Sequence, residues 1–236
     1  MTTVGIYDSG IGGLTTLCLL QRCIPNANFY YLADNLNMPF GTKTNDEIEE
    51  IVYRGIKKLE AHSDVTVLAC NTASATTTAT NVIKLLPNSD DILKDKTLIL
   101  ATPLTLSHLF SAKTHILTAS TPELASKVEI QASLCFKFNQ MLNMAGLHSY
   151  LKDKLAAVFD IENIVLGCSH YAYLKAELTK LFGFVNFFDG NQSLINEVEK
   201  AVETSTKPSK LQFDFTGADD TKKYEYIINN LKDTYI

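Results

Sequence analysis

The sequence predicts an α/β fold with two pseudo-symmetric α/β domains, each a mainly parallel sheet flanked by helices. Short runs of β-branched and aromatic residues alternate with longer helical patterns along the 236 residues, which is typical of α/β units with parallel strands. In addition, a short segment around Cys70 is repeated around Cys168, which indicates an internal duplication. Because functional groups gather at the carboxyl ends of parallel strands, we expect the active site in the cleft between the two domains.

The expected strands are short and rich in β-branched, aromatic and leucine residues. They cover residues 4–7, 29–32, 65–68, 98–100, 115–117, 164–166 and 184–188. Capping signals mark two of the expected helices. Thr44 and Glu47 form a capping box, and the helix that they open runs from acidic to basic residues, as the helix dipole favours. Thr121 offers a second N-cap hydroxyl, with Pro122 at the first helical position.

The composition indicates a soluble protein that binds a small molecule. Apolar residues make up 46% of the chain, which is enough for a large core and excludes general disorder. The net charge of -5 contains no long run of either sign, which argues against a nucleic-acid or membrane-surface partner. The N-terminus has neither the basic nor the apolar part of a leader peptide, and no apolar stretch is long enough to span a bilayer. We therefore expect a cytoplasmic location.

The five cysteines do not form a disulfide or zinc pattern. They are odd in number and widely spaced, and they include no C-x-x-C pair. Cys18, Cys23 and Cys135 lie in apolar surroundings and are interpreted as structural.

Cys70 and Cys168 differ from the other three because each follows an expected strand and one small residue. Each also precedes a small polar residue and a helix start. The positive end of a helix stabilises a thiolate and can lower the thiol pKa from about 8.5 towards neutrality, which would make either cysteine a usable base. A second, weaker correspondence relates the loop at Asp8 to the strand that ends between Thr118 and Thr121.

The loop from Asp8 to Gly13 follows the first strand and leads into a helix, so its backbone N–H groups could bind an anion. A Rossmann motif would require glycine at Thr15, and a P-loop would require a lysine, so a carboxylate is the expected anion, with a merely tight turn as the alternative. Asp8 and His170 could accept or relay a proton.

Three kinds of chemistry compete for the two cysteines. A Cys-His hydrolase would leave Cys70 without a role, and a metal site needs a denser group of ligands than Cys168 and His170 provide. A two-base proton transfer needs two similar acids on opposite faces of one carbon, which two related halves supply. Racemisation or epimerisation follows from this arrangement, while two buried structural cysteines remain the alternative.

Five segments also match motifs of one family. They are Asp8-Ser9-Gly10-Ile11-Gly12-Gly13-Leu14, Pro39-Phe40-Gly41, Cys70-Asn71-Thr72-Ala73, Thr118-x-x-Thr121 and Gly167-Cys168-Ser169-His170-Tyr171. In this order they resemble the glutamate racemases of the cofactor-independent aspartate/glutamate racemase superfamily. The resemblance spans nearly the whole chain. It implies residues 1–94 and 208–236 in the first domain, because residues 213–217 resemble a returning terminal strand, and residues 95–207 in the second.

The resemblance implies that Cys70 removes the α-proton from D-glutamate and Cys168 from L-glutamate, assisted by Asp8 and His170, without a cofactor or a metal. It further implies a homodimer that supplies D-glutamate for peptidoglycan. The residues that it implies for substrate binding are Ser9, Phe40, Gly41, Asn71, Thr72, Thr118, Thr121 and Ser169.

Three departures from the family pattern concern the site. Phe40 replaces the tyrosine of Pro-Tyr-Gly, and Ser169 replaces the threonine of Gly-Cys-Thr-His-Tyr. The stretch between Thr121 and Ile164 is short, and residues 134–139 do not match the family's Phe-Val-Pro-Leu-Val-Glu-Glu, so the glutamate that supports the catalytic histidine has no clear counterpart. Two alternatives therefore stay open: a racemase for aspartate or a related substrate, and a binding protein with reduced catalysis.

Overall fold

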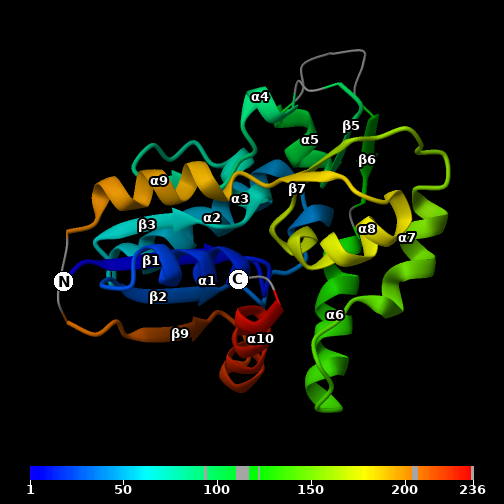
Figure 1. Ribbon diagram of the computed structural model, residues 1–236. Coiled ribbons are helices and arrows are strands. Elements are labelled where there is room, and N and C mark those ends of the chain that lie inside the picture. The colour runs from blue at the N-terminus through cyan, green and yellow to red at the C-terminus, as the bar shows by residue number, and fades with distance from the viewer. Residues whose placement is uncertain (93–94, 110–116, 122, 204–206, 235–236) are drawn as a thin grey trace.

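The computed structural model describes residues 1–92, 95–109, 117–121, 123–203 and 207–234. Within these ranges the strands form two sheets (Figure 1), and every strand pair is parallel. The first sheet contains β1 (Thr3–Asp8), β2 (Asn28–Ala33), β3 (Val65–Leu68), β4 (Ile83–Lys84) and β9 (Leu211–Phe215). The second contains β5 (Thr97–Ala101), β6 (Leu117–Ser120), β7 (Asn163–Gly167) and β8 (Asn186–Phe188).

Helices connect the strands and cover the sheets. The α-helices are α1 (Leu14–Cys23), α2 (Asn45–Glu60), α3 (Asn71–Thr76), α4 (Ser89–Ile92), α5 (Pro103–Leu109), α6 (Leu124–Lys137), α7 (His148–Lys154), α8 (Lys175–Phe182), α9 (Asn191–Ala201) and α10 (Thr221–Thr234). The described part of the chain also contains three short 3-10 helices, η1 (Phe40–Thr42), η2 (Ala145–Leu147) and η3 (Ser169–Leu174). None of the helices in these ranges has the length and apolarity that a bilayer crossing requires.

The order of the strands confirms that the two halves are related. The first sheet runs β4-β3-β1-β2-β9, and the second, read in the corresponding direction, runs β8-β7-β5-β6. This order makes β7 the counterpart of β3, so Cys70 and Cys168 follow equivalent strands. The weaker correspondence expected from the sequence is wrong, because Thr118 lies in β6, the counterpart of β2, whereas Asp8 ends β1, the counterpart of β5.

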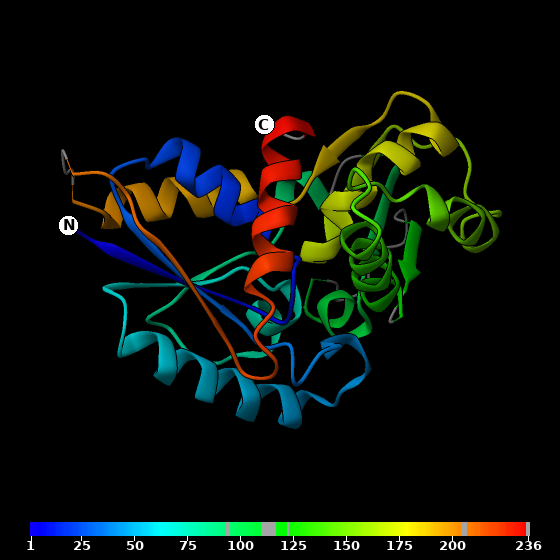
Figure 2. The ribbon, with the colours of Figure 1, turned by 90° about the horizontal axis from the view of Figure 1, so that it is seen from below.

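Helices cover both faces of the first sheet. Figure 2 shows α2 along one face and α1 with α9 along the other. The expected capping box of α2 is present, and its buried side chains recur with helical spacing at Ile48, Ile51, Val52, Ile56 and Leu59. Helix α9 contacts α1 and β4, although its residues were expected in the second domain. Strand β9 returns to the first sheet and pairs with β2.

The hydrophobic core continues from one half into the other. One cluster of buried residues includes side chains of both sheets and of α1, α6 and α10. Helix α10 contacts both α1 and α6, and it lies between the two halves in Figure 2. The last helix of the chain therefore helps to fix the position of one half relative to the other.

Two local expectations differ from the structure, and a third falls largely outside the described residues. The strand expected over residues 184–188 begins at Asn186, and Phe184 is exposed. Of the strand expected over residues 115–117, residues 115 and 116 lie outside the described part of the chain, and β6 begins at Leu117. Pro122 also lies outside it, and α6 begins at Leu124 with Glu123 rather than Thr121 at its N-cap position.

Candidate active site

The two repeated cysteines lie at equivalent strand ends of different sheets. Cys70 follows β3 at the N-cap position of α3, and Cys168 follows β7 at the N-cap position of η3. Both side chains are buried, with exposures of 4% for Cys70 and 7% for Cys168. The thiols are close enough that charge on Cys168 raises the pKa of Cys70. The fold therefore brings one thiol from each half to a shared position.

Cys70 lies beside the first loop. Its Sγ is 3.9 Å from Ser9 Oγ, to which it donates a hydrogen bond. Burial raises the pKa of the Cys70 thiol far above its ordinary value, and the nearby carboxylate of Asp8 raises it further. The expected lowering of the thiol pKa by the helix start is wrong for Cys70, because the cost of burying a thiolate outweighs the effect of the six-residue helix α3.

Cys168 has a buried histidine as its neighbour. The imidazole of His170 forms a hydrogen bond with Cys168, and its Nε2 lies 3.1 Å from Oε1 of Glu129. Burial alone would lower the pKa of His170, but the hydrogen bonds with Cys168 and Glu129 raise it well above its ordinary value. His170 is therefore held between Cys168 and the carboxylate of Glu129, in surroundings that favour its protonated form.

Glu129 is one residue of the candidate site that the sequence interpretation missed. No glutamate was found to support His170 in residues 134–139, but α6 supplies one from an earlier position, and its side chain is buried. A signal was present in the sequence. Glu129 falls on the helix face that buries Ala125, Val128 and Ala132, where an unpaired charge would be costly.

Asp8 connects the first loop to the second half of the chain. Its Oδ1 accepts a hydrogen bond from Gly10 N at 2.8 Å, and its Oδ2 accepts one from Ser169 Oγ at 2.8 Å. Burial raises the pKa of Asp8, while the charge of His170 and the two hydrogen bonds oppose that shift. The carboxylate of Asp8 and the thiols of Cys70 and Cys168 therefore belong to one cluster of buried polar side chains, which is called the buried polar group below.

The backbone of the first loop binds carboxylates of the protein itself. Gly10 N donates to Asp8, and Ile11 N donates to Glu129 Oε1 at 2.6 Å. The expectation that these N–H groups bind an external carboxylate is therefore wrong for Gly10 and Ile11. The loop also needs a glycine at position 12, because a Cβ on Gly12 would lie 2.3 Å from Ser169 Oγ.

A chain of threonine hydroxyls provides a second link between the halves. Thr72 Oγ1 lies 2.9 Å from Thr102 Oγ1, which lies 3.0 Å from Thr105 Oγ1. Thr102 follows β5, the counterpart of β1, so it occupies a place in the second half similar to that of Asp8 in the first. The sequence interpretation missed Thr102 and Thr105, because nothing in their surroundings marks two threonines at a strand end as functional.

Asn71 has an unused acceptor. Its Nδ2 donates to Leu85 O at 3.1 Å, but within the described residues its buried Oδ1 has no hydrogen-bond partner. Buried polar atoms in folded proteins are nearly always paired. The free Oδ1 of Asn71 therefore points to a ligand with a hydrogen-bond donor.

The remaining predicted residues occupy different places. Thr121 is buried and forms hydrogen bonds with Tyr171 Oη through its Oγ1 at 2.5 Å and its carbonyl oxygen at 2.7 Å. Phe40 and Gly41 form η1, in which Phe40 is buried against the ring of Tyr7. Thr118 is exposed in β6, where its backbone pairs with Ile99. The structure therefore does not place Thr118 in the buried polar group.

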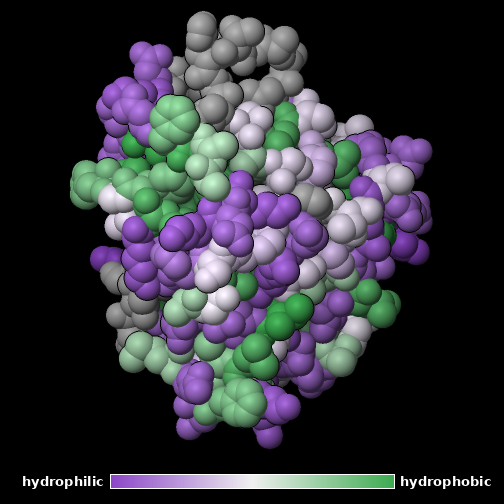
Figure 3. Space-filling view, turned by 90° about the vertical axis from the view of Figure 1, so that its right-hand side faces the viewer, coloured by the Kyte–Doolittle hydropathy of each residue, from purple (hydrophilic) through white to green (hydrophobic). Residues whose placement is uncertain are grey.

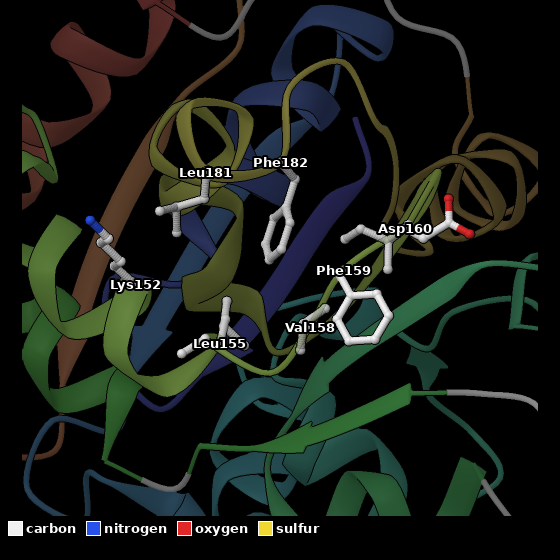
Figure 4. Close-up of a pocket in the computed structure, with 9 residues that line it drawn as sticks. Lys152, Leu155, Val158, Phe159, Asp160, Leu181 and Phe182 are labelled. Carbon is white, nitrogen blue, oxygen red and sulfur yellow. The ribbon is translucent and has the colours of Figure 1, made fainter.

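A hollow elsewhere on the surface does not compete with this site. It has a volume of about 520 Å³ and is lined by apolar side chains such as Leu155 and Phe182, with Lys152 and Asp160 also in its lining (Figure 4). It contains none of the predicted site residues. Apart from Lys152 and Asp160, its lining carries no side chain that could exchange protons or bind charge.

Comparisons with known proteins cover both halves of the chain. No family model matches it. It is 30% identical over 203 residues to the glutamate racemase of Clostridium novyi, which covers 76% of this chain and 75% of that protein. It is 31% identical over 219 residues to the glutamate racemase of Campylobacter curvus, with 83% and 81% covered. The crystal structure of glutamate racemase from Francisella tularensis in complex with D-glutamate superposes with a TM-score of 0.76, at 20% identity, over 97% of this chain and 94% of that one.

Proposed function

The chain belongs to the glutamate racemase family, and on this basis we propose that it interconverts L- and D-glutamate by proton transfer at the α-carbon. One observation carries the proposed mechanism. Cys70 and Cys168 follow equivalent strands of the two halves and lie close together in one buried polar group. Two thiols from opposite halves can serve opposite faces of one carbon.

In the direction from L- to D-glutamate, the surroundings of the two thiols support different roles for them. Cys70 stays protonated because burial and Asp8 raise its pKa, so it can act as the acid. Cys168 acts as the base, and the imidazolium of His170 offsets the negative charge on its sulfur. Cys168 Sγ takes the α-proton of L-glutamate, and Cys70 gives its proton to the opposite face. The products are D-glutamate, a Cys70 thiolate and a protonated Cys168, and the reverse direction exchanges these roles.

The polar side chains around the thiols are proposed to bind the amino acid. The free Oδ1 of Asn71 accepts a hydrogen bond from the substrate ammonium. The Thr72 hydroxyl donates a hydrogen bond to a substrate carboxylate. Its proton is free for this contact when Thr105 donates to Thr102 and Thr102 donates to Thr72. The other proposed contacts come from Ser9, Phe40, Gly41, Thr121 and Ser169, whereas the exposed Thr118 lies outside this group.

Glu129 argues for catalysis rather than for binding alone. The binding-protein alternative depended on a missing partner for His170, and the 3.1 Å contact between Glu129 Oε1 and His170 Nε2 supplies that partner. A supported imidazolium next to Cys168 has a role in proton transfer, whereas simple binding of an amino acid does not require it.

The cellular role and the assembly state are proposed by analogy with the family. We infer a cytoplasmic homodimer that supplies D-glutamate for peptidoglycan. An apolar stripe on α6 supports self-association, because Ile130, Leu134 and Phe138 recur at intervals of four residues and are all exposed. Figure 3 shows apolar side chains gathered towards the lower end of the face where α6 lies. Light scattering of the purified protein tests the homodimer.

Exchange of the α-hydrogen in heavy water tests the proposed reaction. Reduced protein without added cofactor is expected to exchange the α-hydrogen of both L- and D-glutamate, followed by NMR, and to act much more slowly on aspartate. Cys70→Ala and Cys168→Ala are each expected to abolish racemisation, because each removes the acid or base on one face. Cys135→Ala is the matched control, since Cys135 is a buried cysteine of α6 outside the polar group. Full turnover in either of the first two variants would overturn the two-thiol mechanism.

A further inference from the structure

A buried carboxylate that has no part in the proposed mechanism lies next to the site. Asp34 follows β2 directly and is 2% exposed. It accepts hydrogen bonds from Tyr7 Oη at 2.6 Å, from Asn37 Nδ2 at 2.8 Å and from the hydroxyl of Thr216. Its backbone N donates to Asp8 O at 2.8 Å. Asp34 therefore connects β1, the end of β9 and the segment that leads to Phe40 and Gly41.

Tyr7 is the partner of Asp34 that lies nearest to the reaction centre. Successive side chains of a strand point to opposite faces, so Tyr7 and Asp8 leave β1 on opposite sides. The ring of Tyr7 is buried in one cluster with Phe40 and Cys70. Its centroid lies 6.3 Å from that of Phe40, and the ring planes are inclined by 44°.

The structure holds the Tyr7 ring in a fixed position. Helix α2 presents Gly55 to it, and a Cβ at Gly55 would lie 2.3 Å from a ring carbon of Tyr7. Burial raises the pKa of the Tyr7 hydroxyl well above its ordinary value, and the charge of Asp34 raises it further, so the hydroxyl remains a donor. The ring thus lies between α2 and Phe40 while its hydroxyl binds Asp34.

These contacts fix residues 37–41 at two points. Asn37 is bound to the Asp34 carboxylate, and Phe40 packs against the Tyr7 ring. Tyr7 takes part in both, because it contacts Phe40 directly and orients the carboxylate that binds Asn37. In the motif Pro-Tyr-Gly, which the family carries here, the residue at position 40 would itself bear a phenolic hydroxyl.

We propose that Tyr7 is a positioning residue for the substrate-binding segment 39–41, and that its hydroxyl serves in place of the one that Phe40 lacks. Tyr7 acts through Asp34 and Phe40 and does not touch the substrate. This inference rests on the proposed function, since it concerns how well the segment around Gly41 is held for glutamate.

Steady-state racemisation of both glutamate enantiomers by Tyr7→Phe tests the inference. KM is expected to rise about tenfold, the effect of losing one hydrogen bond to a charged group, and kcat is expected to change by less than about twofold, because the two thiols stay in place. In the double variant Tyr7→Phe/Phe40→Tyr, the hydroxyl returns at position 40, and KM is expected to recover to within about threefold of the wild-type value.

Tyr30→Phe is the matched control. Tyr30 is buried in the adjacent strand β2 and donates to another carboxylate, that of Asp214, which also binds Lys58. Both single variants lose one tyrosine-carboxylate hydrogen bond, so a similar fall in Tm is expected for each, whereas only Tyr7→Phe should raise KM.

Equal KM values for Tyr7→Phe and Tyr30→Phe would overturn the positioning role. A double variant as impaired as Tyr7→Phe would contradict the exchange of hydroxyls between positions 7 and 40. A wild-type protein that fails to racemise glutamate would instead refute the proposed function, so the two failures are distinguishable.

Discussion

Glu129 joins two parts of the site that come from different halves of the chain. Its Oε1 accepts from Ile11 N of the first loop at 2.6 Å and lies 3.1 Å from His170 Nε2. Buried carboxylates are costly unless they are paired and hydrogen-bonded, and Glu129 meets both conditions. Together with Cys168, it raises the pKa of His170 above its ordinary value, so a side chain of α6 influences the surroundings of Cys168.

Glu129→Gln is expected to lower kcat for racemisation by about 10- to 100-fold, a loss typical of weakened acid-base catalysis. The amide can still accept from Ile11 N but carries no charge to stabilise the imidazolium. Because Glu129 helps to raise the pKa of His170, its loss should move the alkaline limb of the pH-rate profile to lower pH. Glu123→Gln, at the exposed start of the same helix, is the control. Superimposable pH profiles for wild type and Glu129→Gln would contradict this role.

At the scale of elements, helices α7 and α8 are linked by a hydrogen bond to a buried carboxylate. Glu177 of α8 is 3% exposed. Its Oε2 lies 3.0 Å from His148 Nδ1 of α7, and its Oε1 accepts from Lys180 Nζ at 2.6 Å. Burial alone would raise the pKa of Glu177, but the hydrogen bonds from Lys180 and His148 lower it below its ordinary value.

A pKa that is lower in the folded state gives stability that is present above the unfolded pKa, about 4.3 for glutamate, and is lost as the pH falls through the folded value. Glu177→Gln is therefore expected to lower the free energy of unfolding by about 1–3 kcal/mol at pH 7. The difference from wild type should shrink as the pH falls below about 4.3, because the carboxylate of the unfolded chain then takes up a proton before that of the folded protein. Urea unfolding at several pH values measures this. A difference in unfolding free energy that stays constant from pH 7 to pH 3 would refute this prediction. Glu199→Gln, on the exposed side of α9, is the control and should leave the free energy of unfolding unchanged.

The elements that the sequence predicted well are those that local physics determines. The capping box at Thr44 and the apolar spacing of α2 lie within one helix, so both are visible without knowledge of the fold. The repeat around Cys70 and Cys168 correctly identified equivalent strands. The relation of Asp8 to Thr118 was wrong, because only the sheet order shows that β5 is the counterpart of β1.

The parts of the site that were missed depend on contacts between distant segments. Glu129 and His170 are 41 positions apart, and Thr72 and Thr102 are 30 apart. The sequence shows the helix start at Cys70, so a lowered thiol pKa was expected. It does not show the burial of Cys70 beside Asp8, which raises the pKa instead. Residue types and motifs therefore located the thiols, and the tertiary structure decided their surroundings.

At the scale of the whole molecule, the two halves meet over the thiols. Ser169 Oγ donates to Asp8, Thr72 forms a hydrogen bond with Thr102, and α10 packs against both α1 and α6. Each of these contacts joins segments of different halves or spans the junction. Because Cys70 and Cys168 are almost completely covered, we expect that an amino acid reaches them only after the halves move apart.

Alkylation of the cysteines measures this opening. Cys23 is exposed and is expected to react with iodoacetamide first, whereas Cys70 should react at least about 100-fold more slowly, because its burial and its raised pKa both reduce access to a thiolate. Mass spectrometry of peptides resolves the individual sites.

Thr102→Val removes one link between the halves and should speed the reaction of Cys70 without affecting that of Cys18. Cys18 is a buried cysteine of α1, and burial raises its pKa to about 11. Since opening must precede both alkylation and binding, saturating D-glutamate should slow the reaction of Cys70 in wild type and variant alike. If Cys70 reacts as fast as Cys23, or if Cys18 and Cys70 accelerate together in Thr102→Val, the halves do not control access to the thiols.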